Sequence, residues 1–181
     1  MSRAGAKVIV VDPSADRLAV AREASDAAEQ RVEFHHGDPA ELPFIRGERI
    51  DLAIAIHSLA EVDDLGRVFR QVHRVLRSES PLLVSLPHPL AIVASLESSP
   101  TPQMTRTSFD PGPADWATDE DSGKVIPHRI ADVFTTLSRS NFRVDTLWEP
   151  LSLETYATWH WSPLAEWVPL CFVIRGKKEG I

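Results

Sequence analysis

The sequence predicts an α/β fold, in which a mostly parallel sheet carries helices on both faces. Two observations lead to this prediction. Short apolar runs alternate with helical patterns through the first half of the chain, as they do in successive strand–helix–strand units. The run at residues 7–11 (KVIVV) is β-branched and apolar on both faces, which is typical of a buried parallel strand.

The predicted elements follow one another at short intervals. After the strand at residues 7–11, Ser14 is expected to cap a helix over residues 15–28. Further strands are predicted at residues 32–35, 50–56 and 81–86. A helix between the last two strands is predicted from apolar residues at helical spacing, namely Leu65, Val68, Phe69, Val72, Val75 and Leu76.

The second half of the chain is less regular. Residues 97–123 carry four prolines and six acidic residues and show no apolar periodicity, so we expect an inserted lid or a disordered loop. Order returns with a helix that contains Ile130, Val133, Phe134 and Leu137. Asn141 is expected to end that helix in a left-handed conformation. Strands follow at residues 142–148 and 170–175, with an aromatic insertion at residues 150–169 between them. We expect residues 1–181 to form a single domain.

Composition excludes several classes of function. The net charge of −7 argues against nucleic acid as a main partner, because phosphate binding needs clustered Lys and Arg. No apolar run is long enough for a membrane span. The single cysteine, Cys171, excludes an internal disulfide and a cysteine-based zinc site. His35 and His36 point to opposite faces of a strand, so no metal is expected there. A cytoplasmic enzyme or binding domain is therefore expected.

Three predicted strands end in residues that suit ligand binding, because open α/β sheets bind ligands beyond the carboxyl ends of their strands. Asp12 can accept hydrogen bonds from two ribose hydroxyls, or it can serve the turn before a helix. Asp38 can accept from an exocyclic amine such as that of adenine, or it can be an ordinary turn residue. His57 can be a base, a ligand contact or a packed side chain.

The order and spacing of these segments resemble one family. VIVVDPS is followed by VEFHHGDPAELPF and then by IDLAIAIHSLAEVDDLGRVFRQVHRVLR. This pattern is similar to class I, Rossmann-like methyltransferases that act on small molecules with S-adenosylmethionine as cofactor. The resemblance implies that Asp12 and Pro13 lie at the cofactor ribose and that Asp38 and Pro39 lie at the adenine. It also implies that Ile56 and His57 lie along the methionine part.

The chain departs from that family at its N-terminal end. The family begins with a strand and a glycine-rich loop, whereas residues 2–7 read like the end of the helix that follows that loop. A misassigned start codon, a truncated gene or a shortened expression product would each explain this. The absent strand is central in the family, so its neighbours at residues 7–11 and 50–56 are expected to pair directly or to expose their edges. Marginal stability, weak cofactor binding and impaired activity are the expected consequences.

Candidate residues for the methyl acceptor lie farther along. His88 is flanked by prolines, which restrict its backbone, and can be a base, an acceptor contact or a plain loop residue. His128 opens the later helix beside Arg129, and similar enzymes carry a histidine facing the substrate near this place. Aromatic side chains in the inserted segments can roof an acceptor pocket or pack those segments down, namely Trp116, Trp159, Trp161 and Trp167.

Two other functions stay open. A non-catalytic methyltransferase remnant that acts as a binding or interaction module would keep half of the nucleotide site. A nicotinamide-dependent oxidoreductase would also use Asp12, but the GDPAELPF segment and the lack of a Tyr-x-x-x-Lys pair argue against it. The sequence identifies neither the acceptor nor the atom that is methylated. A missing central strand would permit strand exchange between chains, and hence a homo-oligomer.

Overall fold

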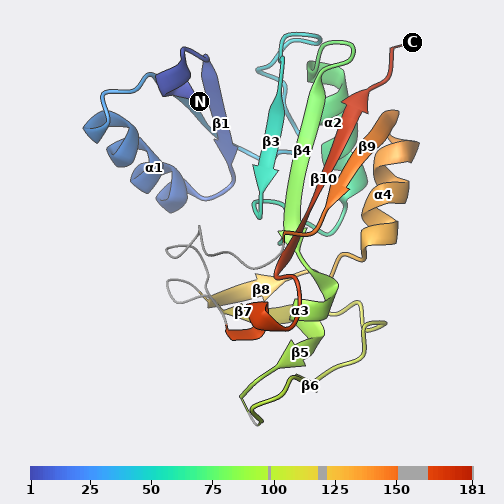
Figure 1. The fold of residues 1–181 in the computed structure, drawn as a ribbon. Coiled ribbons are helices and arrows are strands. Elements are labelled where there is room, and N and C mark those ends of the chain that lie inside the picture. Colours follow the sequence, from blue (N-terminus) through green and yellow to red (C-terminus); the bar gives the residue numbers. More distant parts are fainter. Residues whose placement is uncertain (98, 118–121, 151–162, 181) are drawn as a thin grey trace. The chain divides into compact units, whose positions relative to one another are not determined.

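The computed structural model describes residues 1–97, 99–117, 122–150 and 163–180 (Figure 1). The chain divides into two compact units, Met1–Arg46 and Gly47–Ile181. Within the described residues, the first unit contains one sheet and the second contains three, and both units contain helices. The α/β class is therefore confirmed, with sheets that are only partly parallel. The assignment of residues 1–181 to one domain stays a prediction.

The first unit contains one parallel strand pair and one helix. After a short 3-10 helix, η1 (Ser2–Ala4), strand β1 (Val8–Asp12) pairs with β2 (Val32–His36). Helix α1 (Ala15–Ala27) connects these two strands. Ser14 caps α1 as predicted, because its side chain accepts the Arg17 N–H at 3.2 Å. Leu18 is the buried residue of this helix.

The second unit contains a four-stranded sheet in the order β3-β4-β10-β9. Its strands are β3 (Ala53–Ile56), β4 (Pro81–Pro87), β9 (Phe142–Trp148) and β10 (Cys171–Lys178). β3 and β4 are parallel, whereas β10 lies antiparallel to both β4 and β9. The carboxyl ends of β3 and β4 therefore lie at the same end of the sheet, as a site at these strand ends requires.

Two helices pack on the buried face of this sheet (Figure 1). α2 (Leu65–Val75) contributes Phe69, and α4 (Ile130–Arg139) contributes Val133 and Leu137, all fully buried. Phe134 was predicted on the same apolar face but is 46% exposed, because it lies one position beyond the stripe that Val133 and Leu137 form.

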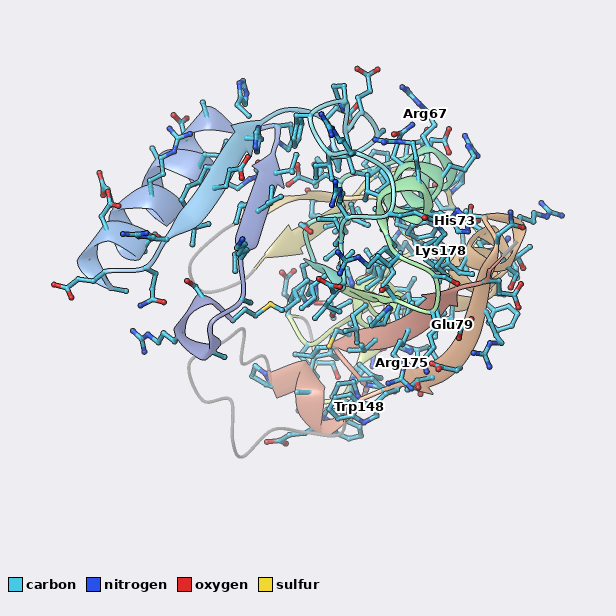
Figure 2. The ribbon with its side chains drawn as sticks, turned by 90° about the horizontal axis from the view of Figure 1, so that it is seen from above. Arg67, His73, Glu79, Trp148, Arg175 and Lys178 are labelled. Atoms are coloured by element: carbon cyan, nitrogen blue, oxygen red, sulfur yellow. The ribbon has the colours of Figure 1, made fainter. Side chains whose placement is uncertain are left out.

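A buried lysine ties the end of β10 to the end of α2. Lys178 donates from Nζ to the Leu76 carbonyl at 2.9 Å and to Glu48 at 3.4 Å. Figure 2 shows His73 of α2 beside Lys178. Because the ammonium group satisfies a carbonyl at the helix end, it can be buried without being left unpaired.

Residues 89–125 contain several short elements between β4 and α4. α3 (Pro89–Val93) leads into β5 (Ala94–Ser95), which pairs with β6 (Gln103–Met104). β7 (Ala114–Ala117) and β8 (Ser122–Val125) form an antiparallel pair. The predicted loop at residues 97–123 therefore contains β6, β7 and the start of β8. They are too short to produce the alternating pattern by which strands are found in a sequence.

Some expected features are open or fall outside the described chain. Within the described residues, β3 pairs only with β4, and its Ile54 and Ile56 are 43% and 55% exposed. The expectation that this strand either pairs with β1 or exposes its edge stays a prediction. Trp116 lies on β7, and Trp167 follows the 3-10 helix η2 (Pro163–Glu166) and is 54% exposed. Trp159 and Trp161 lie outside the described residues.

In the described part of the chain, the helices are too short or too polar to span a lipid bilayer.

Candidate functional site

Asp12 ends β1 with one carboxylate oxygen engaged. Oδ1 accepts the Ser14 N–H at 2.7 Å and the Arg17 Nε–H at 3.1 Å. Asp12 therefore stabilises the turn before α1, which was one of the two roles predicted for it. Both bonds use Oδ1, so Oδ2 retains the capacity to accept hydrogen bonds from a ligand. The two interpretations of Asp12 are thus compatible.

Asp38 lies two residues after β2, at the same end of the parallel pair as Asp12. The register Asp12↔His36 and the bond from Gly37 N–H to the Asp12 carbonyl (3.1 Å) join the two strand ends. His36 adds a contact from Nε2 to the Pro13 carbonyl at 2.9 Å. Asp38 accepts the Ala40 N–H through Oδ1 at 2.7 Å, which again leaves Oδ2 for a ligand. The first unit therefore presents two carboxylates from one edge, with Pro13 and Pro39 in the adjoining turns.

The end of β3 has a constrained backbone. His57 follows Ile56 directly and has a left-handed φ of 53°. Its N–H donates to the Ser85 carbonyl of β4 at 2.9 Å, and its Nε2 lies 3.5 Å from the Ser85 Oγ. A left-handed histidine costs roughly 1–2 kcal/mol relative to the right-handed form, so the bonds to Ser85 hold a turn that the residue alone would not adopt.

His128 is bound to the loop that follows β3. Its Nε2 donates to the Val62 carbonyl at 2.8 Å, and the Ile126 N–H donates to the Ala60 carbonyl at 2.7 Å. Burial lowers the pKa of His128 below its ordinary value, although the bond to Val62 opposes this effect. The neutral ring therefore carries its proton on Nε2, and Nδ1 is the basic nitrogen. The strand-end loop and His128 form one bonded cluster within the second unit.

His88 is buried at the start of α3, and both of its ring nitrogens are engaged. Nδ1 accepts the Leu90 N–H at 3.1 Å as the cap of the helix, so the neutral ring carries its proton on Nε2. Nε2 lies 3.1 Å from Oε1 of Glu149 and donates to it. The ring also stands edge-on to Phe172. These contacts fix the turn between β4 and α3 and leave neither nitrogen free to accept a proton.

Sequence reasoning missed two side chains that shape this region. Ser85 is buried and its hydroxyl lies next to the His57 ring. Glu149 accepts a hydrogen bond from His88, which is 61 residues earlier in the chain. Ser85 leaves a signal in the sequence, because it is the one polar residue in the apolar run PLLVSL. Glu149 leaves none, since it follows an ordinary strand and is itself half-exposed.

Comparison with known proteins identifies the family that this chain resembles. Residues 1–84 match the methyltransferase domain family. A ubiquinone biosynthesis O-methyltransferase from Azorhizobium caulinodans is 31% identical over 85 residues, a stretch that covers 47% of this chain and 33% of that protein. The chain thus matches only about a third of the length of this curated relative.

Two solved structures share the fold over nearly the whole chain. A Listeria monocytogenes protein described as a putative S-adenosylmethionine-dependent methyltransferase has a TM-score of 0.73 at 14% identity, covering 96% of this chain and 80% of its own. An S-adenosylmethionine-dependent methyltransferase from Mesorhizobium loti has a TM-score of 0.72 at 22% identity, covering 95% and 80%. The chain therefore resembles the class I S-adenosylmethionine-dependent methyltransferases, in sequence over residues 1–84 and in fold over nearly its full length.

Proposed function

We propose that this chain acts as a methyltransferase that uses S-adenosylmethionine and a small-molecule acceptor in the cytoplasm. The match of residues 1–84 to the methyltransferase domain family supports the reaction class. The O-methyltransferase from Azorhizobium caulinodans supports a small, hydroxyl-bearing acceptor. The fold supports the same assignment without deciding it, because one fold can host many reactions.

The residues that would hold the cofactor lie at the strand ends. Asp12 would accept the ribose hydroxyls through Oδ2, and Asp38 would accept the adenine amine in the same way, since the bonds of both carboxylates within the described residues use Oδ1. The backbone of Ile56 and His57 would line the methionine part, with Pro13 and Pro39 in the flanking turns. When bound, the cofactor supplies a methyl group on a positively charged sulfur.

His128 is the residue that we assign to accept a proton from the acceptor hydroxyl. The observation that carries this assignment is the bond from Nε2 to the Val62 carbonyl at 2.8 Å, because it directs the proton to Nε2 and leaves Nδ1 basic. The lowered pKa keeps the ring neutral, and hence able to act as a base, near pH 7. His88, whose nitrogens are both engaged, would position the β4–α3 turn.

Calorimetric titration with S-adenosylhomocysteine tests cofactor binding. We expect Asp12→Asn to weaken binding at least tenfold, because a charged hydrogen-bond acceptor contributes about 1.5–3 kcal/mol. Asp16→Asn is the matched control, since Asp16 is an acidic residue in the first turn of α1, the helix that follows Asp12, and has no assigned role. The weak binding expected from the sequence is measured in the same titration. Absence of binding would refute the proposed function.

A methyl-transfer assay with catechol as acceptor tests the role of His128. His128→Gln keeps a distal N–H for the Val62 carbonyl but has no basic nitrogen, so kcat should fall by about 10²–10⁴ while affinity for S-adenosylhomocysteine is unchanged. His35→Gln, which alters a histidine of the other unit that has no role in either proposed site, serves as the control. An unchanged kcat would place the base elsewhere. Cofactor binding without transfer to any of a panel of phenols, amines and thiols would favour the alternative, a non-catalytic binding module.

A further inference from the structure

Residues 57–62, which we call the β3 turn, are bonded to the end of the sheet and to one another. His57 begins the turn, and its N–H donates to the Ser85 carbonyl of β4 at 2.9 Å. Inside the turn, the Ala60 N–H donates to the His57 carbonyl at 3.0 Å. Leu59 and Ala60 are each only 4% exposed. The β3 turn is therefore held in place by both backbone bonds and burial.

A short segment between β8 and α4 crosses the β3 turn and bonds to it twice. The Ile126 N–H donates to the Ala60 carbonyl at 2.7 Å, and His128 Nε2 donates to the Val62 carbonyl at 2.8 Å. Donors two residues apart thus meet carbonyls two residues apart. Pro127 lies between the two donors, where its ring fixes its own backbone and restricts that of Ile126 to extended conformations. The segment is therefore stiff between its two bonds.

The same segment is anchored in the buried core on both sides. Val125, the last residue of β8, is 5% exposed and pairs with the buried Ala114 of β7. On the other side, α4 packs on the sheet through side chains that are fully buried. Since the turn and the segment are each held by their own surroundings, the bond from Ile126 to Ala60 fixes how His128 lies relative to the end of β3.

We propose that Ile126 is a positioning residue for methyl transfer, because its N–H keeps His128 in register with the β3 turn. This inference rests on the proposed function, which assigns Ile56 and His57 to the methionine part of the cofactor and His128 to the acceptor proton. A ligand that holds the β3 turn also orders His128, since one bonded cluster includes both. The cofactor is thus expected to bind before the acceptor. A misplacement of about 1 Å can reduce a rate about a hundredfold, so the register affects transfer more than cofactor affinity.

Hydrogen exchange in the full chain, with and without S-adenosylhomocysteine, is the first test. Saturating ligand should slow exchange of the Ile126 amide at least tenfold, together with that of the Ala60 amide, because both bonds belong to the β3 turn. Ligand that slows the Ala60 amide but leaves the Ile126 amide unchanged would overturn the inference.

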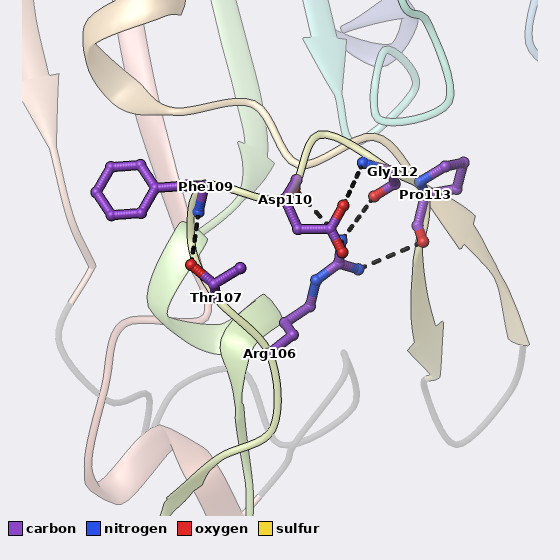
Figure 3. A network of polar contacts seen from close by, with 6 residues as sticks. All are labelled: Arg106, Thr107, Phe109, Asp110, Gly112 and Pro113. Atoms are coloured by element: carbon purple, nitrogen blue, oxygen red, sulfur yellow. Dashed lines mark hydrogen bonds and ion pairs between the residues drawn. The ribbon is translucent and has the colours of Figure 1, made fainter.

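The control for this measurement is the neighbouring loop at residues 106–113 (Figure 3). Arg106 closes the loop by donating to its carbonyls, at 2.8 Å for Gly112 and 3.3 Å for Asp110. The Gly112 N–H is also bonded, to Asp110 Oδ1 at 2.9 Å. Because these bonds stay within the loop, the ligand should leave exchange of the Gly112 amide unchanged. Equal slowing at Gly112 and Ile126 would indicate a general tightening of the second unit and would also overturn the inference.

A pair of variants at one position tests the effect on transfer. Ile126→Pro removes the N–H, whereas Ile126→Val is the matched control because it keeps the N–H and a similar side chain. In the transfer assay, Ile126→Pro should lower kcat at least tenfold, with less than a threefold change in Kd for S-adenosylhomocysteine, and Ile126→Val should resemble the wild type. Equal losses in the two variants would mean that side-chain packing is responsible, and not the N–H. Should Ile126→Pro not fold, the exchange data on the wild type decide alone.

The outcomes separate this inference from the proposed function. If S-adenosylhomocysteine does not bind, the proposed function fails and the inference fails with it. If the ligand binds and methyl transfer occurs, but the Ile126 amide does not respond and Ile126→Pro keeps its kcat, the proposed function stands and Ile126 has no positioning role.

Discussion

His57 shows how a single backbone angle can mark a site. Its φ of 53° is unfavourable for a histidine, and the Ser85 carbonyl and hydroxyl hold the turn from a neighbouring strand. Unfavourable backbone angles persist where the surrounding structure over-determines them, and such places are often functional. The sequence predicted that His57 ends a strand. It could not predict the angle, because Ser85 is 28 residues away and its contact depends on the β3–β4 register.

His73 is the residue at which we expect stability to depend on pH. Its Nε2 is buried and has no hydrogen-bond partner in the described chain, and its ring stands edge-on to Phe142. Burial, and then the charge of Lys178, lower the pKa of His73. The unfolded chain, with an ordinary pKa near 6.5, therefore binds the proton more readily than the folded chain. Stability should be full above about pH 6.5 and should fall as the pH drops below it.

Urea unfolding at pH 7.5 and pH 5.5 measures this dependence. His73→Gln should reduce the loss of stability between the two pH values, because it removes the titrating group. Some loss should persist, since burial also lowers the pKa of His128. His36→Gln, which alters an exposed histidine of the other unit, is the control and should leave the loss unchanged. If His73→Gln and the wild type lose the same free energy of unfolding between pH 7.5 and pH 5.5, His73 does not cause the pH dependence.

At the scale of the elements, helix α1 ends in a Schellman motif built on an unsuitable residue. The Gln30 N–H donates to the Ser25 carbonyl at 2.9 Å, and the Glu29 N–H donates to the Asp26 carbonyl at 3.0 Å. This geometry puts Glu29 at a φ of 52°, where glycine is the residue that fits. We predict that Glu29→Gly stabilises the chain by about 0.5–1 kcal/mol, once the greater freedom of glycine in the unfolded chain is subtracted.

The free energy of unfolding from urea titration measures this gain. Glu29→Ala is the control, because it removes the same charge but keeps a Cβ, and it should give no comparable gain. If Glu29→Gly and Glu29→Ala change the free energy equally, the backbone angle is not the cause.

Long apolar elements were predictable, whereas short or locally irregular ones were not. β9 occupies the predicted residues. α2 ends one residue before the predicted stripe does, and its buried face leaves a clear helical period in the sequence. β3 starts three residues late, since Ile50 forms an isolated bridge to Leu76 instead. The five-residue helix α3 was missed because it is shorter than two turns and begins at a proline. No period can be read from so few residues.

At the scale of the molecule, strand order explains how far the site could be predicted. Residues that end parallel strands meet at one edge, so Asp12 with Asp38, and His57 with the turn at His88, follow from the element order alone. The contacts of His128 do not follow, because its hydrogen bond goes to the carbonyl of Val62, which is 66 residues earlier in the chain. Such a distant contact depends on how the segment before α4 packs against the loop after β3. No periodic pattern in the sequence predicts that packing.

The two units should differ in local stability. The first unit buries few apolar side chains, namely Leu18, Ala40, Leu42 and Ile45, whereas the strands of the second unit include Val84, Phe172 and Ile174 at 0% exposure. Because local opening is easiest where little apolar surface is buried, amides of β1 and β2 should exchange with deuterium at least about tenfold faster than those of β4 and β10.

Hydrogen exchange followed by NMR can connect this difference to the proposed function. If Asp12 and Asp38 hold the cofactor, S-adenosylhomocysteine binds the first unit only when that unit is folded. At saturation it should therefore slow exchange in β1 and β2. At 100 times Kd, the stabilisation should approach about 2.7 kcal/mol, or roughly a hundredfold in exchange rate, and Asp12→Asn should reduce it at the same ligand concentration. Equal protection of both sheets without ligand would show that the units open together. Slowing that survives in Asp12→Asn would show that the ligand is held by other residues.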